Sequence, residues 1–338
     1  MPRDDDLWQS AAVTIWREVP GAATAPRDAP AAVTIGVFDG VHRGHQHVLA
    51  AAREAADGHP VVAVTFEPHP AAVLAPDRAP KRLTTIERRV ELLSAHGADD
   101  VRVLAFDREM STWTPEEFIQ RVLVEQLHAS AVVVGENFRF GSKAAGDVDL
   151  LRAVGAEAGF SARGLALDGG EQPFSSTLVR EHVAAGRLAE AADVLGRPHE
   201  VSGVVVEGDR RGRSLGFPTA NVPVDDTYAV PPDGVYAGRV DIGTEVLPAA
   251  ISVGTNPTFD GRDRRVESYV IERPADGSPL DLYDRTIRVE FVRRLRGMDV
   301  FDTVEALVAQ MHEDVADTRA ALAEGRAGGS DSPAAHPR

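Results

Sequence analysis

Two histidines three residues apart are the first groups in this chain whose types and spacing could do chemistry. They are His42 and His45, in residues 36–45, which read Gly-Val-Phe-Asp-Gly-Val-His-Arg-Gly-His. A strand that ends near Phe38 and a helix that begins after the turn would place both imidazoles on one helix face. The unpaired N–H groups and the dipole of a helix start favour phosphates. The spacing therefore predicts a phosphate site, with two surface histidines near a turn as the plainer alternative.

A second stretch with phosphate chemistry lies far downstream, at residues 208–221, and reads Gly-Asp-Arg-Arg-Gly-Arg-Ser-Leu-Gly-Phe-Pro-Thr-Ala-Asn. Its glycines would let the backbone approach a polyphosphate with no Cβ in the way, and arginines lie between them. Thr219 and Asn221 offer hard oxygen ligands on one face of a strand, which suits Mg²⁺ shared with ATP. A glycine-rich hairpin is the alternative. The residues concerned are Gly208, Gly212 and Gly216, with Arg210, Arg211 and Arg213 between them.

Composition limits the class of protein that carries these two stretches. The chain has 338 residues, more than the ~100 to 200 typical of one domain, and a net charge of −16, which argues against nucleic acid or an anionic membrane as a partner. Cysteine is absent, so disulfides and thiolate chemistry are excluded. Neither lysine, Lys81 or Lys143, lies in a P-loop, so ATP must be held in another way. No apolar run reaches the ~18 residues of a membrane span, and we expect a cytoplasmic protein.

The first half of the chain alternates short β-branched runs with amphipathic stretches. This order predicts an α/β domain with a parallel, Rossmann-like sheet covered by helices. We place it at 31–196, after a flexible lead-in over 1–30 that contains a strand candidate at 13–16. The other strand candidates are 32–38, 61–66, 100–105 and 131–135, and the helix candidates are 44–56, 85–95, 115–126 and 147–158.

The second half changes its period. A helical stretch over 176–195, broken near Gly186, ends at Gly196-Arg197-Pro198, and apolar residues then recur at every second position. This pattern predicts an antiparallel β-barrel over 197–324, covered by an amphipathic helix at 302–322. The tail, 325–338, is rich in Gly, Ser and Pro, which is typical of disorder. The strand candidates are 201–207, 234–242, 247–253, 265–272 and 286–292.

Residues 36–45 resemble the His-x-Gly-His motif of the nucleotidyltransferase superfamily, and other segments narrow the resemblance to its flavin branch. These segments are Thr-Phe-Glu-Pro-His-Pro at 65–70, Gly-Glu-Asn-Phe-Arg-Phe-Gly at 135–141, and Ser-Ser-Thr at 175–177 followed by Arg180. The order and spacing resemble the prokaryotic bifunctional riboflavin kinase/FMN adenylyltransferase (FAD synthetase) family over about 31–323.

The resemblance implies roles for the upstream residues. His42 and His45 would stabilise the charge that develops as the FMN phosphate attacks the α-phosphate of ATP, and Ser176, Thr177 and Arg180 would close over the ATP phosphates. A helix N-cap is the alternative for 175–177, and core packing is the alternative for Phe66. Two departures from the family are Asn137, where aspartate is common, and Leu178, where a basic residue is frequent. The remaining implied contacts are Gly36, Phe38, Asp39 and Gly44 for nucleotide, and Phe66, Pro68 and Asn137 for flavin.

The downstream stretch is similar to the family's riboflavin kinase domain, in which the glycine-rich loop and Phe217-Pro218-Thr219-Ala220-Asn221 hold ATP and Mg²⁺. The segments 231–236 and 254–259 also match family motifs. The family's base is a glutamate on the next strand, which implies Glu267, and a solvated strand carboxylate is the alternative. Arg296 is implied as a nucleotide or flavin contact, and Asp284 stands where the family usually has glycine.

Together these features predict an enzyme that phosphorylates riboflavin to FMN in the C-terminal barrel and adenylylates FMN to FAD in the N-terminal domain. ATP is the co-substrate and Mg²⁺ the metal in both. One alternative is a paralogue that retains the kinase but has a weakened or altered adenylyltransferase, and another is a flavin-binding protein without turnover. Weak self-association of the chain into a homo-oligomer is a further expectation.

Overall fold

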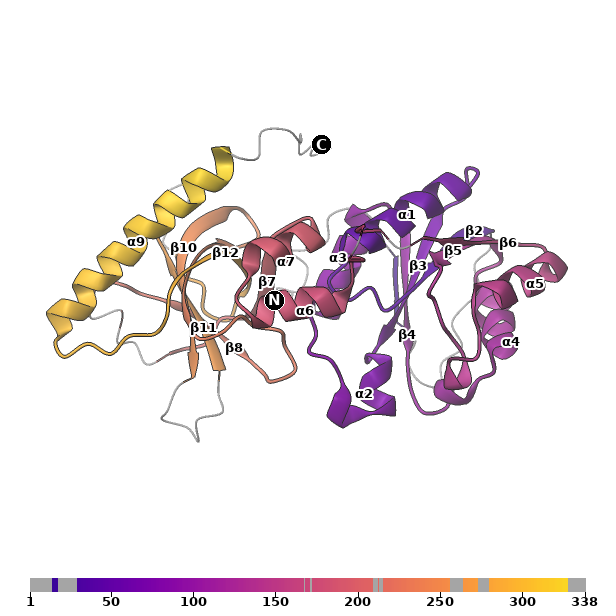
Figure 1. Ribbon diagram of the computed structural model, residues 1–338, viewed down its shortest axis with the longest axis horizontal. Helices are drawn as coiled ribbons and strands as arrows, with labels where there is room; N and C mark the ends of the chain where they lie inside the picture. Colours follow the sequence, from indigo (N-terminus) through magenta and orange to yellow (C-terminus); the bar gives the residue numbers. More distant parts are fainter. Residues whose placement is uncertain are drawn as a thin grey trace, which may run out of the picture. The chain divides into compact units, whose positions relative to one another are not determined.

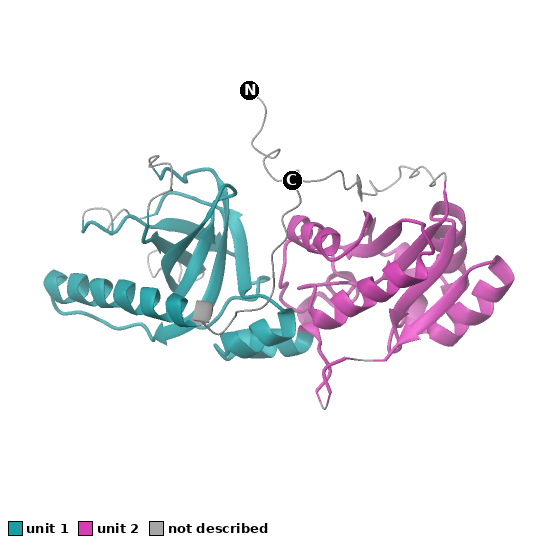
Figure 2. Cartoon of the chain, turned by 90° about the horizontal axis from the view of Figure 1, so that it is seen from above, with its two compact units in different colours: residues 1–8, 177–338 teal, residues 9–176 magenta. Residues whose placement is uncertain are grey.

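The computed structural model of the chain (Figure 1) describes residues 14–17, 29–166, 168–170, 172–208, 212, 215–255, 264–272 and 280–327. Arg210, Arg211, Arg213 and the predicted loop at 256–259 lie outside the described residues. Contacts divide the chain into two compact units, with the division between Ser176 and Thr177 (Figure 2).

The unit that comes first along the chain, Gln9–Ser176 (magenta, unit 2 in the key of Figure 2), is called the first unit here, and the teal one the second unit. The first unit is built on a six-stranded parallel sheet with the order β1-β4-β3-β2-β5-β6. The predicted parallel α/β fold is confirmed, and residues 14–17 of the expected lead-in form an edge strand. The sequence missed β6, whose alternating exposure and few apolar residues are those of an opposite edge. The strands are β1 Thr14–Arg17, β2 Ala31–Ile35, β3 Val61–Glu67, β4 Asp100–Ala105, β5 Ala129–Gly135 and β6 Ser161–Leu165.

Helices cover both faces of this sheet (Figure 1), so the central strands are buried on both sides and read as continuous apolar runs. Local capping fixes where several helices begin: the Thr114 side chain and Glu117 form a capping box, and Asp147 accepts from the Leu150 N–H. The helices are α1 Arg43–Ala55, α2 Pro70–Leu74, α3 Ile86–Ala95, α4 Pro115–Phe118 with a π-helical continuation over Ile119–Gln126, and α5 Val148–Ala158.

The strand order places a topological switch at β2. The chain leaves β2 for β3 on one side, and β5 lies on the other side. In open α/β sheets, ligands bind beyond the carboxyl ends of the strands at such a point. The predicted His-x-Gly-His segment follows β2 directly, and Asn137 follows β5, so the topology brings both to that edge.

The second unit contains an antiparallel sheet with the order β7-β12-β9-β10-β11-β8. Val206, just after β7, bridges to Asn221 of β8, so the two ends of the sheet meet and the barrel is nearly closed. The predicted antiparallel barrel is confirmed. Its elements are α6 Ser176–Ala184, α7 Leu188–Leu195, β7 His199–Val204, β8 Ala220–Val224, β9 Gly234–Asp241, β10 Val246–Thr255, β11 Arg264–Val270, β12 Thr286–Arg296 and α9 Val304–Ala327.

Two element bounds of the second unit differ from the sequence prediction. Helix α9 continues to Ala327, so the tail does not begin at 325. Strand β12 continues to Arg296 through two register shifts that bend it along the barrel. The change of hydrophobic period predicts a domain boundary at 196/197. Helix α7, just before it, packs on β7 and β12, and its Leu188 belongs to the barrel core, because a short apolar helix is stable only against a larger element.

Candidate active sites

The turn after β2 has a backbone that side chains rarely adopt. Phe38 has φ of 53° and Val41 has φ of 42°, with Gly40 at 82° between them. Phe38 and Val41 are both buried in the cluster against α3 and β4, so the core holds the turn in this conformation. Left-handed residues maintained by their surroundings are typical of functional sites.

This turn ends at the predicted histidine pair. His42 is the N-cap residue of α1, and its ring stacks on that of His45 with 3.6 Å between centroids. The Phe38 ring meets His45 edge-on at 5.1 Å. A Cβ at Gly44 would lie 3.1 Å from Cε1 of His42, so a larger residue there would press on the stacked rings. The structure thus brings both histidines together at a helix start, as the spacing predicted.

The environment of His45 favours the neutral imidazole. Burial, then the charges of His42 and Arg89, lower the pKa of His45 well below its ordinary value of 6.5. Its Nδ1 is buried without a hydrogen-bond partner. A neutral imidazole can donate one hydrogen bond, and an incoming polyphosphate would raise its pKa.

Asp39 has a different position from the one its motif implied. Its carboxylate is 2% exposed and accepts from the N–H groups of Leu83 and Thr84, at 2.9 to 3.1 Å, and from the Thr84 hydroxyl. The guanidinium of Arg89 lies 3.7 Å away. Ser176 donates its hydroxyl proton to the Asp39 carbonyl at 2.7 Å. The side chain of Asp39 therefore positions the 83–84 segment and the turn.

Arg89 is a residue of this site that sequence reasoning missed. It lies on α3 among Val90, Leu92 and Leu93, all buried, and donates to the Phe66 carbonyl at 3.2 Å. An arginine on the buried face of an amphipathic helix is the signal that could have identified it, because a buried charge requires partners.

The other upstream candidates come from several elements. Phe66 is 9% exposed and packs edge-on against Phe106 at 6.0 Å, within the core. Asn137 is exposed after β5, and Pro68 follows a cis peptide bond after β3. Thr177 and Arg180 begin α6 and belong to the second compact unit. Leu178 is buried, so its apolar side chain suits its place where the family often has a basic residue.

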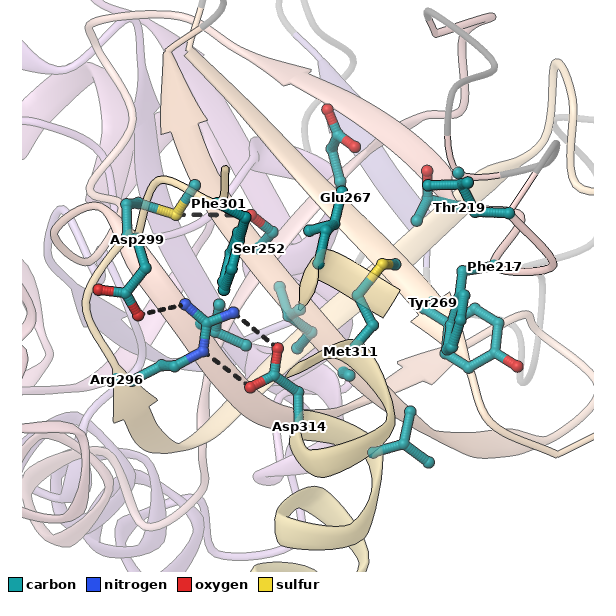
Figure 3. Close-up of a pocket in the computed structure, with 18 of the residues that line it drawn as sticks. Phe217, Thr219, Ser252, Glu267, Tyr269, Arg296, Asp299, Phe301, Met311 and Asp314 are labelled. Carbon is teal, nitrogen blue, oxygen red and sulfur yellow. Dashed lines mark hydrogen bonds and ion pairs between the residues drawn. The ribbon is translucent and has the colours of Figure 1, made fainter. Parts of the chain in front are cut away.

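The second unit contains a cavity of about 560 Å³ (Figure 3). Glu267 extends into it from β11, between Ser252 and Thr219. The opposite wall is formed by the 297–303 segment and by one face of α9. The lining is largely apolar on that wall, through Met298, Phe301, Val304, Leu307, Met311 and Val315.

Strand register explains how residues far apart in sequence converge at this cavity. Glu267 of β11 is directly opposite Asn221 of β8 on one side and Ser252 of β10 on the other. Side chains of directly opposed residues share a face of the sheet, about 5 Å apart. The carboxylate, the amide and the hydroxyl therefore lie in one row.

The predicted metal ligands, Thr219 and Asn221, lie together, and hydrogen bonds within the protein do not occupy all of their oxygen atoms. The Asn221 amide donates to the Thr219 carbonyl at 3.1 Å and to the Thr219 hydroxyl oxygen at 3.3 Å. Asn221 Oδ1 is buried and has no hydrogen-bond partner. A buried oxygen without a donor is costly unless a cation or donor satisfies it. The pair fits a hard cation such as Mg²⁺, with ATP oxygens completing the shell.

Glycine is favoured at positions 208, 212 and 216, near this pair, for different physical reasons. A Cβ at Gly208 would lie 2.6 Å from Asn221 Oδ1, and one at Gly212 would lie 2.3 Å from the Phe217 carbonyl oxygen. Gly216 adopts φ of 87°. Packing thus favours glycine at 208 and 212, and the left-handed backbone favours it at 216, in addition to any approach of phosphate.

Two further candidates, Phe217 and Arg296, line the cavity and contact α9. The ring of Phe217 lies 4.9 Å from Tyr269 and 5.0 Å from His312 of α9. Arg296 pairs with Asp314 of α9 and with Asp299, and these acids raise its pKa further. Asp284, where a glycine was expected, adopts φ of 60°, which aspartate tolerates better than most residues.

Comparison with known proteins supports the same division of the chain. Residues 24–178 match the FAD synthetase family, and residues 195–322 match the riboflavin kinase family. A bifunctional riboflavin kinase/FMN adenylyltransferase from Escherichia coli (strain K12) is 37% identical over 303 residues, which are 88% of this chain and 94% of that protein. This chain belongs to the bifunctional riboflavin kinase/FMN adenylyltransferase family. The Pseudomonas fluorescens member is 38% identical over 296 residues, 86% of this chain and 92% of its own.

A solved structure agrees with this architecture. A crystal structure from Streptococcus pneumoniae, described as a macrolide-efflux protein, superimposes with a TM-score of 0.76 at 31% identity and covers 87% of this chain and 95% of that one. None of the helices that the structure describes is long and apolar enough to cross a membrane. The chain is a transferase that combines riboflavin kinase and FMN adenylyltransferase, and the comparisons do not favour a flavin-binding protein without turnover.

Proposed function

We propose that the barrel cavity carries out the kinase step, with Glu267 as the base and Thr219 and Asn221 as ligands of Mg²⁺. The observation that supports this most directly is the register that sets Glu267 across from Asn221, whose Oδ1 has no protein partner. A base beside a metal-bound triphosphate is the arrangement that phosphoryl transfer to an alcohol requires.

In this step Glu267 accepts the proton of the riboflavin hydroxyl as that oxygen bonds to the γ-phosphorus of ATP. The bond from the γ-phosphorus to the bridging oxygen breaks, and ADP leaves. The Mg²⁺ neutralises charge on the phosphate oxygens when it is bound. The apolar wall opposite Glu267 suits a flavin ring, whereas the glycine-rich segment suits the phosphates.

The adenylyl transfer belongs to the turn after β2. A phosphate oxygen of FMN attacks the α-phosphorus of ATP, and pyrophosphate leaves with the electron pair of the broken bond. His42 and His45 donate hydrogen bonds to oxygens that gain charge in the transition state. Ser176, Thr177 and Arg180 are proposed to contact the phosphates, together with N–H groups of the turn that includes Gly36, Phe38 and Gly44.

The flavin contacts proposed for this step are Pro68 and the exposed Asn137, with Phe66 supporting them from the core. Asp39 acts on the nucleotide through the turn that it holds. In the kinase cavity, Arg296 already uses four of the five N–H groups of a guanidinium, so at most one remains for a ligand.

Two variants test the assignment, each serving as the control of the other. Glu267→Gln retains size and removes basicity, so riboflavin phosphorylation should fall by roughly 10² to 10⁴ while supplied FMN is still adenylylated. His42→Ala/His45→Ala should leave FMN formation near that of the native chain and lower FAD formation by ~10² or more.

The measurement is chromatography of the flavins after incubation with ATP and Mg²⁺, starting either from riboflavin or from FMN. Normal phosphorylation in Glu267→Gln would make this residue an ordinary strand carboxylate. Comparable FAD synthesis in the double variant would remove the histidines from the adenylylation site. A native chain that forms FMN but no FAD would identify the kinase-only paralogue.

A further inference from the structure

We propose that Asp314 is a positioning residue of the kinase cavity: through Arg296 it holds the 297–303 segment and α9 as one wall against which riboflavin binds. The inference rests on the proposed kinase function of the barrel. It gives Asp314 and Asp299 roles that neither motif nor spacing suggested.

The contact at the centre of this wall is a two-point ion pair. Arg296 Nε donates to Asp314 Oδ1 and Arg296 Nη2 donates to Asp314 Oδ2, both at 2.8 Å (Figure 3). The Asp314 side chain is 8% exposed and that of Arg296 is 21% exposed, so solvent screens the pair little. Bidentate charge-assisted pairs fix orientation as well as distance.

The same guanidinium also holds the segment that follows β12. Its Nη1 donates to the Gly297 carbonyl and to Asp299 Oδ2, both at 3.0 Å. One arginine thus joins the end of a strand, the 297–303 segment and the last helix. Thr303, at the end of this segment, accepts from the N–H groups of Ala306 and Leu307 in the first turn of α9, whereas Arg296 ties the segment to Asp314, about two turns further along the helix.

The face of α9 that carries Asp314 is the one that lines the cavity. Leu307, Met311, Asp314 and Val315 recur at helical spacing and all line it. Met298 and Phe301 line it from the 297–303 segment. The pair therefore fixes the distance between two apolar surfaces, and a flat apolar ligand needs that distance to be constant.

This wall lies apart from the groups proposed to do the chemistry. Glu267 and Thr219 extend from β11 and the 217–219 segment on the other side of the cavity (Figure 3). Contacts to the non-reacting ring of a substrate are equal in the ground and transition states, so their loss raises KM and leaves kcat nearly unchanged. Most side chains of this wall are apolar, and its charged groups Arg296, Asp299 and Asp314 pair with one another, so KM for riboflavin should respond and KM for ATP should not.

A second ion pair between the same strand and the same helix provides the matched control. Arg293 Nη2 pairs with Glu324 Oε2 at 2.7 Å, but these side chains are 51% and 63% exposed and neither lines the cavity. Exposed pairs contribute little. Glu324→Gln therefore removes a helix-to-strand ion pair without altering the wall.

The experiment compares riboflavin phosphorylation by the full chain and by Asp314→Asn, Asp299→Asn and Glu324→Gln. Asp314→Asn retains size but loses the charge and one acceptor, so KM for riboflavin should rise about tenfold or more, with kcat and KM for ATP within about twofold. Asp299→Asn should raise KM for riboflavin less, because it releases only the loop side. Glu324→Gln should match the native chain.

A double variant separates positioning from simple stability. If Asp314 acts through Arg296, adding Arg296→Gln to Asp314→Asn should raise KM for riboflavin little further. Adenylylation of supplied FMN reports on the other unit and should not change. An unchanged KM for riboflavin in both aspartate variants, or an equal rise in Glu324→Gln, would overturn the proposal. Should Asp314→Asn fail to fold, Asp299→Asn decides; absence of phosphorylation in the native chain would instead refute the kinase assignment.

Discussion

Replacing Gly208 by alanine displaces the side chain of Asn221, a proposed metal ligand, without changing that residue itself. The new Cβ would lie 2.6 Å from Oδ1 and 2.7 Å from Cγ of Asn221. Asn221 is only 4% exposed and its backbone is paired within β8, so the amide must turn away from Thr219 for the methyl group to fit. The variant should therefore weaken the metal site and leave Glu267 in place.

The expected magnitude follows from the cost of that overlap. Inserting a methyl group into packed surroundings costs about 1 to 3 kcal/mol. Expressed as loss of Mg²⁺ affinity, this is a rise of about 5- to 150-fold in the Mg²⁺ concentration for half-maximal activity, at about tenfold per 1.4 kcal/mol.

Gly203→Ala is the matched control for this variant. A Cβ at Gly203 would lie 2.5 Å from Cγ1 of Val222, the residue after Asn221 on the same strand. Val222 faces the barrel core, so the overlap is similar while its direction is away from the cavity. This variant should lower the melting temperature but retain the native Mg²⁺ dependence.

The assay is the initial rate of riboflavin phosphorylation as free Mg²⁺ is varied above a fixed, saturating ATP concentration, with thermal melting of each variant in parallel. If Gly208→Ala and Gly203→Ala show the same Mg²⁺ dependence as the native chain, Asn221 is not a metal ligand. The reasoning from its buried, unpartnered oxygen would then be refuted.

Two further predictions concern His45 and the helix before the barrel. Because the pKa of His45 is lowered from 6.5, the unfolded chain binds this proton below pH 6.5 while the folded chain does not. The free energy of unfolding therefore decreases as the pH is lowered below 6.5, by at most about 1.4 kcal/mol per pH unit. Denaturant unfolding at pH 7.5 and 5.5 should show a smaller decrease for His45→Gln; an equal decrease would contradict the lowered pKa. A fragment over 187–327 should fold and phosphorylate riboflavin. A fragment over 197–327 should have a free energy of unfolding lower by about 1.5 to 3 kcal/mol, because it lacks the buried Leu188. Equal melting temperatures of the two fragments would show that α7 does not contribute to the stability of the barrel.

The local patterns of the sequence predicted most of the elements. Five of the six strands of the parallel sheet and five of the six of the barrel were identified, because a continuous apolar run and a period of two each report which faces are buried. The edge strand β6, the five-residue β8 and the short α2 were missed, since an exposed edge and elements of five residues have little periodicity. The sequence predicted one helix over 115–126 and did not distinguish its π-helical part, Ile119–Gln126.

By itself the sequence determined the chemistry that is available: a histidine pair at a helix start, and a hydroxyl and an amide two residues apart. These are local relations, set by the periods of helix and strand. Tertiary structure decided which residues meet. Register placed Glu267 opposite Asn221, burial turned the Asp39 carboxylate toward the 83–84 segment, and the docking of α9 gave Arg296 its partner Asp314. Such pairings depend on how separate elements pack, and no local period encodes them.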